Sequence, residues 1–211
     1  MNQPLVTRHT ITPTQLYKEI LDPSVNYVLI GEDHFSGVHK SNERKILEKM
    51  LKSKRPCRLA LENFEESHRP LFKAARTSSE KREELRRMIK PMTFPGKNGK
   101  PFELGKYHWA IIGLMFEYGK EVIPINPDEP KGDVLSRAER YARLARNLRS
   151  LKPNVLTVSI HGEANVSSEE FTGQLRIPER ERRHVIQGNY LESLVYKNGK
   201  GDHVMFLNRC L

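Results

Sequence analysis

The sequence predicts an α/β fold, with a mainly parallel central sheet, helices on both faces of it and a C-terminal antiparallel hairpin at one edge. Three observations support this prediction. Short apolar runs of strand length alternate with segments of helical periodicity through about residues 25–166. Polar residues follow each apolar run, as expected where parallel strands end. Near the C-terminus, two further runs flank the turn sequence Asn-Gly-Lys-Gly, which is typical of a hairpin.

The first half of the chain predicts four helices and two strands. Thr12 or Thr14 can cap the first helix, which ends at an Asp-Pro pair. Gly31 ends an apolar strand, and Ser41 is expected to cap an amphipathic helix. The predicted helices cover 13–22, 41–53, 66–76 and 79–90, and the strands cover 26–31 and 57–63.

The second half continues the alternation. Residues 90–106 are rich in Pro and Gly. They form either a loop that covers the candidate site at the strand ends, described below, or an ordinary surface loop. An almost wholly apolar helix then ends at Gly119, and Tyr107 and Trp109 are expected in the core. The predicted helices cover 107–119 and 134–151, the strands cover 120–126 and 154–162, and the hairpin strands cover 192–197 and 202–208.

We expect all 211 residues to form a single domain. Hydrophobic residues make up 37% of the chain, enough for one core. No apolar run is long enough for a transmembrane helix, and the N-terminus lacks the design of a Sec signal peptide. The two cysteines fit neither a disulfide framework nor a zinc site. The sequence therefore predicts a soluble protein.

The net charge of +10 is concentrated in residues 69–106, which hold eleven Lys and Arg against four Glu. Such a segment can attract phosphate or an anionic membrane surface, but it is also typical of a solvated basic surface. No RNA-binding aromatic motif, zinc finger or helix-turn-helix is present. The charge therefore identifies no nucleic-acid partner.

Ionisable or amide residues follow all four predicted parallel strands. Because ligands bind at the carboxyl edge of such sheets, we expect these side chains to share one cleft. The residues at the strand ends are Glu32, Asp33, His34, Glu62, Asn63, Asn126 and His161. Asp33 and the nearby His39 are expected to be turn residues or to support the others.

This set suits general acid–base chemistry. Glu32 or Glu62 can hold a histidine in one tautomer, and His34 or His161 can then take a proton from water. An arginine can hold an anionic group or stabilise an oxyanion. Two histidines and two carboxylates also suit a divalent ion, but no HExxH or equivalent ligand spacing supports that alternative.

Several segments resemble the erythromycin-esterase/ChaN-like superfamily, with TraB/Tiki-type proteins as more distant relatives. "LIGEDHFSGVH" resembles its GExH element, and "LALENF" resembles its second strand. "YHWAIIGLMFEYGKEVIPINPDEP" is similar to its aromatic helix and following strand, "RYARLARNL" to its Arg-containing helix, and "VSIHGEANV" to its last strand. The order of the segments is that of the family. The length also resembles short versions among bacterial type III effectors and toxin domains.

The resemblance implies a catalytic cluster of Glu32, His34, Glu62, Arg140 and His161. In the esterase branch such residues activate water for ester hydrolysis without a covalent serine intermediate, and in the haem-uptake branch the fold binds haem. The implied function is a hydrolase-like virulence effector that acts on an ester- or phosphate-type substrate. For Arg140, a solvated basic face is the alternative, because four further arginines lie on its helix.

The sequence also departs from the family pattern. The esterase branch has a second histidine after the last strand, where this chain has Ala164 and Asn165, which argues against macrolide-esterase activity. A large helical region is also missing. A haem lipoprotein would need an export signal and an N-terminal lipid-attachment cysteine, and neither is present. Two alternatives stay open: a protein that binds haem or another anionic ligand, and a catalytically inactive interaction protein recognised in a host cell.

The resemblance also sets the expected partners and location. We expect no cofactor, with haem or a divalent metal as the alternatives. The expected partners are an unknown small-molecule or host-cell substrate and a host protein target. The expected location is the bacterial cytoplasm before export, followed by delivery into a host cell.

Overall fold

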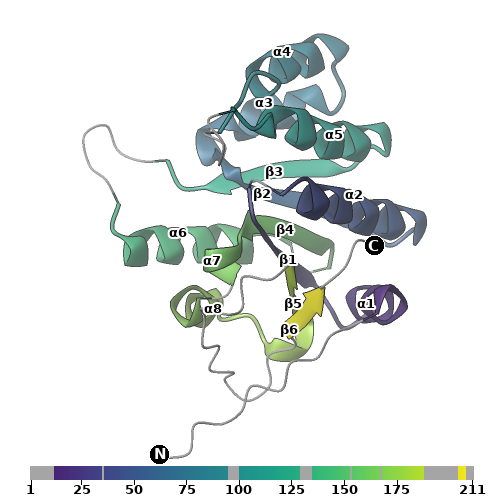
Figure 1. Ribbon diagram of the computed structural model, residues 1–211, viewed down its shortest axis with the longest axis vertical. Helices are drawn as coiled ribbons and strands as arrows, with labels where there is room; N and C mark the ends of the chain where they lie inside the picture. The colour runs from purple at the N-terminus through teal and green to yellow at the C-terminus, as the bar shows by residue number, and fades with distance from the viewer. Residues whose placement is uncertain are drawn as a thin grey trace, which may run out of the picture.

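A six-stranded sheet forms the centre of the protein in the computed structural model (Figure 1). The structure describes residues 12–34, 36–94, 100–128, 135–152, 154–166, 168–187 and 204–207. The strands are β1 (Tyr27–Glu32), β2 (Cys57–Glu65), β3 (Glu121–Asn126), β4 (Leu156–Gly162), β5 (Arg182–Gln187) and β6 (Val204–Leu207). Their order is β3-β2-β4-β1-β5-β6, and every neighbouring pair runs parallel.

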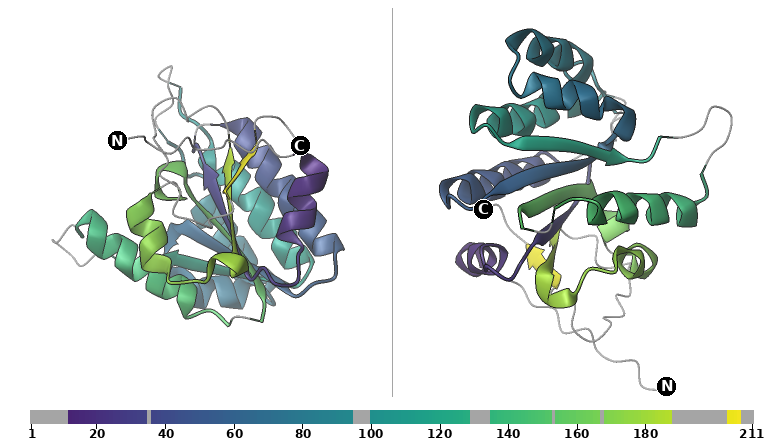
Figure 2. Two further views of the ribbon diagram at one scale, coloured as in Figure 1. Left: turned by 90° about the horizontal axis from the view of Figure 1, so that it is seen from below. Right: turned by 180° about the vertical axis from the view of Figure 1, so that it is seen from behind.

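Helices cover both faces of this sheet (Figure 2). One face packs against α1 (Pro13–Ile20), α2 (Gly37–Lys52), α3 (Arg69–Ala75), α4 (Ser79–Ile89) and α5 (Leu104–Glu117). The other face packs against α6 (Arg137–Arg149), α7 (Glu163–Val166) and α8 (Glu169–Leu175). Two short 3-10 turns, η1 (Glu66–His68) and η2 (Glu179–Glu181), complete the described elements. No helix in the described ranges is both long and apolar enough to cross a bilayer.

The strands are apolar on both sides because both faces are covered. In β4, Val158 and Ile160 belong to the core beneath α1–α5, whereas Ser159 and His161 alternate with them and point to the other face. By the same alternation, Glu32 follows Ile30 toward the α2 face. The two-residue period therefore sends the polar ends of the neighbouring strands β1 and β4 to opposite faces of the sheet.

The four predicted strands of the core and the helices between them are confirmed, with shifted ends. The largest shift is at α2, which begins at Gly37 rather than near Ser41. Ser36 is its N-cap, because its Oγ accepts a hydrogen bond from the His39 amide at 3.3 Å. The earlier start places His39 and Lys40 on the helix, directly behind the end of β1.

The expected antiparallel edge is not confirmed. A strand is present within 202–208 as β6, but it pairs with β5 in parallel. Its expected hairpin partner, 192–197, lies outside the described residues. Strand β5 itself was not predicted, because it opens with three polar residues, Arg182, Arg183 and His184. All of its residues are nevertheless buried.

Candidate functional site

The end of β1 holds a glutamate–histidine pair. Glu32 is 2% exposed, and its Oε1 lies 2.6 Å from Nδ1 of His34. The His34 side chain is 29% exposed, and within the described residues its Nε2 makes no hydrogen bond. A carboxylate on Nδ1 fixes the tautomer in which Nε2 is free to accept a proton. This pair therefore has the arrangement of a general base and the carboxylate that orients it.

A buried lysine stands behind this pair. The ammonium of Lys40, on α2, donates to Oε2 of Glu32, and it lies 3.7 Å from Oε2 of Glu43. Gln187 at the end of β5 approaches Glu43, with 3.5 Å between Nε2 and Oε1. Burial lowers the pKa of Lys40 and raises that of Glu43, and their mutual attraction opposes both changes. Lys40 is thus the counter-charge for two buried carboxylates.

Asn63 and an aromatic ring complete this half of the site. Asn63 lies 3.3 Å from Oε1 of Glu32 and 2.8 Å from Nε2 of His108, through its Nδ2. Burial holds the pKa of His108 well below 6.5, and the charges of Lys40 and His34 act in the same direction. The ring of Phe94, in the loop 90–106, lies 5.9 Å from that of His34. One described part of this loop therefore borders the site.

The second half of the site centres on Glu62, at the end of β2. Its Oε2 lies 3.1 Å from Nδ1 of His161 and accepts from the Gly162 amide at 3.2 Å. Its Oε1 accepts from Nδ2 of Asn165 at 2.5 Å and lies 3.6 Å from Nη2 of Arg140. Burial alone would raise the pKa of Glu62. The hydrogen bonds from His161 and Asn165, with the charges of His161 and Arg140, lower it below its ordinary value.

His161 is fully buried between two partners. Its Nδ1 faces Glu62, and its Nε2 lies 2.6 Å from Oγ of Ser159. With both ring nitrogens occupied and no exposed surface, His161 cannot reach a solvent water as the structure stands. Its geometry is that of a residue that positions Glu62, whereas His34 is the histidine open to solvent.

The two halves meet at Gly162. A Cβ at this position would lie 3.6 Å from Nε2 of His34 and 3.8 Å from Nδ2 of Asn165. Both polar atoms therefore lie within 4 Å of one point at the carboxyl edge of the sheet. Arg140 borders the same half of the site as Asn165, with 40% of its side chain exposed. A solvent-facing base, an amide and a guanidinium thus surround a shared edge.

The structure brings together the five residues that the sequence singled out, in two connected groups. Glu32 pairs with His34, and Glu62 contacts both His161 and Arg140. Of the other strand-end residues, Asp33 donates its amide to Nδ1 of His39 at 2.9 Å, away from these contacts. Within the described residues, no three His, Cys, Asp or Glu side chains are arranged to hold a metal ion.

Sequence reasoning missed three contributors: Lys40, Glu43 and Asn165. Lys40 lies on the first turn of α2, which the predicted helix over 41–53 leaves out, and Glu43 follows it three residues later. Asn165 lies, with Ala164, in the stretch where the resemblance implied a second histidine, and its Nδ2 donates to Glu62. A buried carboxylate requires a cationic partner, and this rule, applied to Glu32, would have indicated the nearby Lys40.

Replacing Lys40 by Met is expected to destabilise the fold by roughly 3–5 kcal/mol, because two buried carboxylates lose their counter-charge. Urea unfolding measures this. The matched control is Lys52→Met at an exposed position of the same helix, for which we expect a change within about 0.5 kcal/mol. Equal effects of the two substitutions would contradict the proposed role of Lys40.

Glu62 should make stability depend on pH. Its folded-state pKa lies below 4.5, so its ionised form stabilises the fold above this pH, and the contribution is lost as the pH falls through the lowered pKa. We expect the free energy of unfolding of the wild type to exceed that of Glu62→Gln most near neutral pH. The difference should shrink below pH 4.5 in urea titrations. A difference that does not change with pH would refute this account.

Comparisons with known proteins give structural matches alone. No family model matches the sequence, and no curated protein matches it significantly. A structure of ChaN of Campylobacter jejuni, described for cofacial haem binding, matches with a TM-score of 0.67 and 12% identity, over 92% of this chain and 91% of that chain. The structure of the type III effector HopBA1 matches with a TM-score of 0.51 and 15% identity, over 98% and 99%.

A toxin domain shares the fold as well. RRSP, a MARTX toxin effector domain from Vibrio vulnificus, matches with a TM-score of 0.56 and 19% identity, over 84% of this chain and 36% of that one. At such identities the likeness establishes architecture alone. The expected resemblance to the erythromycin-esterase/ChaN-like superfamily, including an effector of this shape, is therefore confirmed at the level of the fold.

Proposed function

We propose that the protein is a hydrolase-like bacterial effector that activates water at the carboxyl edge of its sheet, with His34 as general base. One observation carries the proposal: a partly exposed imidazole is held at 2.6 Å by a buried glutamate whose other oxygen accepts from a buried lysine. Neither the glutamate nor the lysine is exposed to solvent. Such a chain of contacts fixes the orientation and tautomer of His34 before a substrate arrives.

The reaction then follows from the groups present. Nε2 of His34 accepts a proton from water while the water oxygen attacks an ester carbonyl or a phosphoryl group. Glu32 stabilises the resulting imidazolium through Nδ1. The imidazolium then returns its proton to the leaving oxygen, so the cycle consumes one water and needs no covalent enzyme intermediate.

The Glu62 group supplies the anion-binding side of the site. Arg140 is partly exposed and lies 3.6 Å from Glu62, so one part of its guanidinium is held while the rest can face a substrate. A guanidinium in this place would bind a carboxylate or phosphate, or stabilise a developing oxyanion. Glu62 and His161 are positioning residues in this scheme, since both are buried and fully engaged.

The proposed setting is a host cell. The fold is shared with HopBA1, a type III effector, and with RRSP, a toxin effector domain, along nearly the full length of the first. That likeness supports a virulence role and a host target for this chain, reached by delivery from the bacterial cytoplasm into the host cell. The bond cleaved is proposed as an ester or a phosphate ester.

The direct test is hydrolysis of p-nitrophenyl acetate, butyrate and phosphate by purified variants. We expect His34→Ala and Glu32→Gln each to lower kcat by at least about 100-fold, the usual contribution of an oriented general base. Arg140→Ala should chiefly affect the phosphate substrate. Glu117→Gln, at an exposed site on α5, is the matched control and should leave kcat unchanged.

Activity that survives in His34→Ala would refute the proposed base. If the variants also retain the host-cell phenotype while circular dichroism shows them folded, the protein acts through an interaction surface instead. That outcome would favour the alternative of a catalytically inactive protein recognised by a host.

Haem binding is the second candidate, favoured by the ChaN match and by one feature of the site. His34 is the site imidazole whose outward nitrogen is open to solvent, and such a nitrogen would be a suitable ligand for haem iron. His161 does not fit this role, because both of its ring nitrogens are engaged and buried. Haem binding at His34 would block its use as a base.

Titration with haemin separates the two functions. If the protein binds haem, the Soret band should shift at stoichiometric haemin, and the shift should be lost in His34→Ala and retained in Glu117→Gln. An unchanged shift in His34→Ala would exclude His34 as the ligand.

A further inference from the structure

A second concave site lies at the outer edge of the sheet, away from the residues described above. It is a pocket of about 220 Å³ between α3, the first half of β3 and the end of α6. Its β3 residues, Glu121, Val122 and Ile123, pair in register with Arg58–Ala60 of β2, ahead of the strand end that carries Glu62. The pocket is therefore distinct from the carboxyl-edge site.

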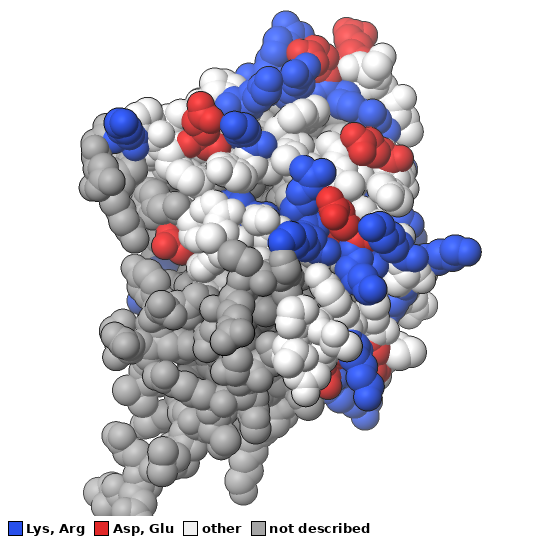
Figure 3. Space-filling view, turned by 45° about the vertical axis from the view of Figure 1, so that its right-hand side comes forward, with Lys and Arg blue, Asp and Glu red and all other residues white. Residues whose placement is uncertain are grey.

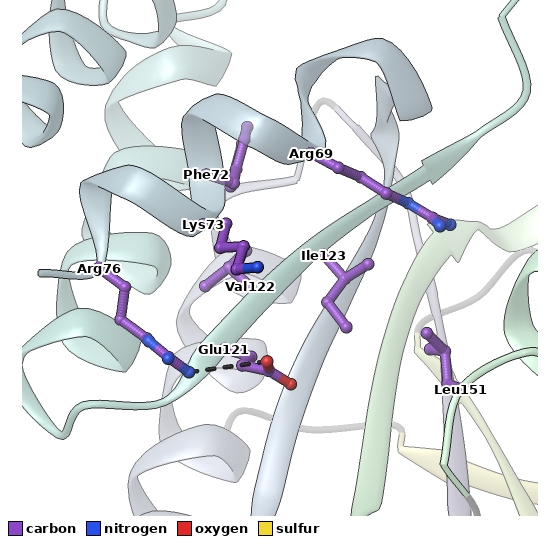
Figure 4. A pocket seen from close by; sticks show the side chains of 8 residues that line it. All are labelled: Arg69, Phe72, Lys73, Arg76, Glu121, Val122, Ile123 and Leu151. Carbon is purple, nitrogen blue, oxygen red and sulfur yellow. Dashed lines mark ion pairs between the residues drawn. The ribbon is translucent and has the colours of Figure 1, made fainter.

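The floor of this pocket is apolar and its rim is cationic (Figure 4). Its apolar lining comes from both faces of β3: Phe72 and Val122 belong to the core beneath α1–α5, and Ile123 packs with Leu151 on the other face. Three cations come from one face of α3 and its C-cap residue, since positions three and four residues apart are neighbours on a helix. They are Arg69, Lys73 and Arg76, and Lys73 lies between the two arginines (Figure 4).

The three cations differ in whether a carboxylate of the protein already neutralises their charge. Arg69 is engaged by Glu66 at 3.0 Å and by the Pro124 carbonyl at 2.8 Å. Arg76 lies 3.6 Å from Glu121, and more than half of that glutamate is exposed. Lys73 makes no ion pair with any residue in the described ranges. The lining therefore carries three cations and one carboxylate, and the Lys73 ammonium, which has no carboxylate partner among the described residues, borders the apolar lining.

The size of the pocket restricts its ligand. A cavity of roughly 150 Å³ accepts a benzene ring, whereas sites for drug-sized ligands take roughly 300–1,000 Å³. At about 220 Å³, the pocket has room for one ring with a small substituent and none for a macrocycle such as haem. Cations above an apolar floor favour a ligand with an anionic head, and both ammonium and guanidinium groups interact well with aromatic faces.

We propose that this pocket is a binding site for a small aromatic carboxylate, which places its ring on Ile123 and Leu151 and its carboxylate at Lys73. The inference stands independently of the proposed hydrolase function, since it shares no residue with that site. An ordinary alternative is that the cations simply protect an edge strand from pairing with other chains. The apolar floor beneath them distinguishes the two explanations, because protection alone requires no concave apolar surface.

The test is fluorine NMR titration of the full chain with 4-fluorobenzoate, alongside the neutral analogue 4-fluorobenzamide. We expect saturable binding of the carboxylate and at least about tenfold weaker binding of the amide. Lys73→Met, which keeps the alkyl chain, should weaken carboxylate binding by about tenfold or more, the loss typical of a charged hydrogen-bond partner.

The control must account for non-specific attraction of an anion, because many basic side chains lie on the described part of the face shown in Figure 3. Lys52→Met makes the same charge change at an exposed position outside the pocket, and it should leave carboxylate binding unchanged. Ile123→Ser should weaken both ligands. Equal affinity for acid and amide, or equal losses in Lys73→Met and Lys52→Met, would overturn the proposal. Circular dichroism of each variant confirms that it is folded.

Discussion

The ion pair between Lys40 and Glu32 is the contact on which the candidate site depends. Taking either charge out of water is costly, and each is tolerated because the other is present. The pair ties the first turns of α2 to the end of β1, and it leaves one glutamate oxygen to hold His34 at 2.6 Å. The orientation of the exposed imidazole is thus set by groups that no solvent reaches.

The alternation of β-strand side chains then divides the site between the two faces of the sheet. Glu32 and its partners lie toward α2, whereas His161 and Glu62 lie toward α6 and α7. Neither set of residues extends by itself from one face of the sheet to the other. They meet where β4 ends at Gly162, next to which both His34 and Asn165 present a nitrogen. The small residue at this position leaves the edge open, because a side chain there would contact both groups.

Much of this arrangement was predictable from sequence because it depends on local signals. Apolar runs that end in charge place strands and their polar ends at one edge of the sheet, which is how Glu32, His34, Glu62 and His161 were identified.

The parts that were missed depend on tertiary contacts. Lys40 lies on α2, behind the end of β1, because Ser36 rather than Ser41 caps this helix. Strand β5 begins with buried polar residues that are stabilised by partners distant in sequence. Arg183, for example, donates a hydrogen bond to Glu19. The parallel pairing of β6 with β5 lies beyond a local hairpin rule, which considers only the sequence between two strands.

The central claim is that Glu32 fixes the tautomer of His34, so that Nε2 is the basic atom. Long-range proton–nitrogen NMR of the imidazole measures this directly, with the His34 signals assigned by their loss in His34→Gln. The account predicts that neutral His34 carries its proton on Nδ1, and that this preference is lost in Glu32→Gln. A wild-type protein in which neutral His34 is protonated on Nε2 would contradict the account.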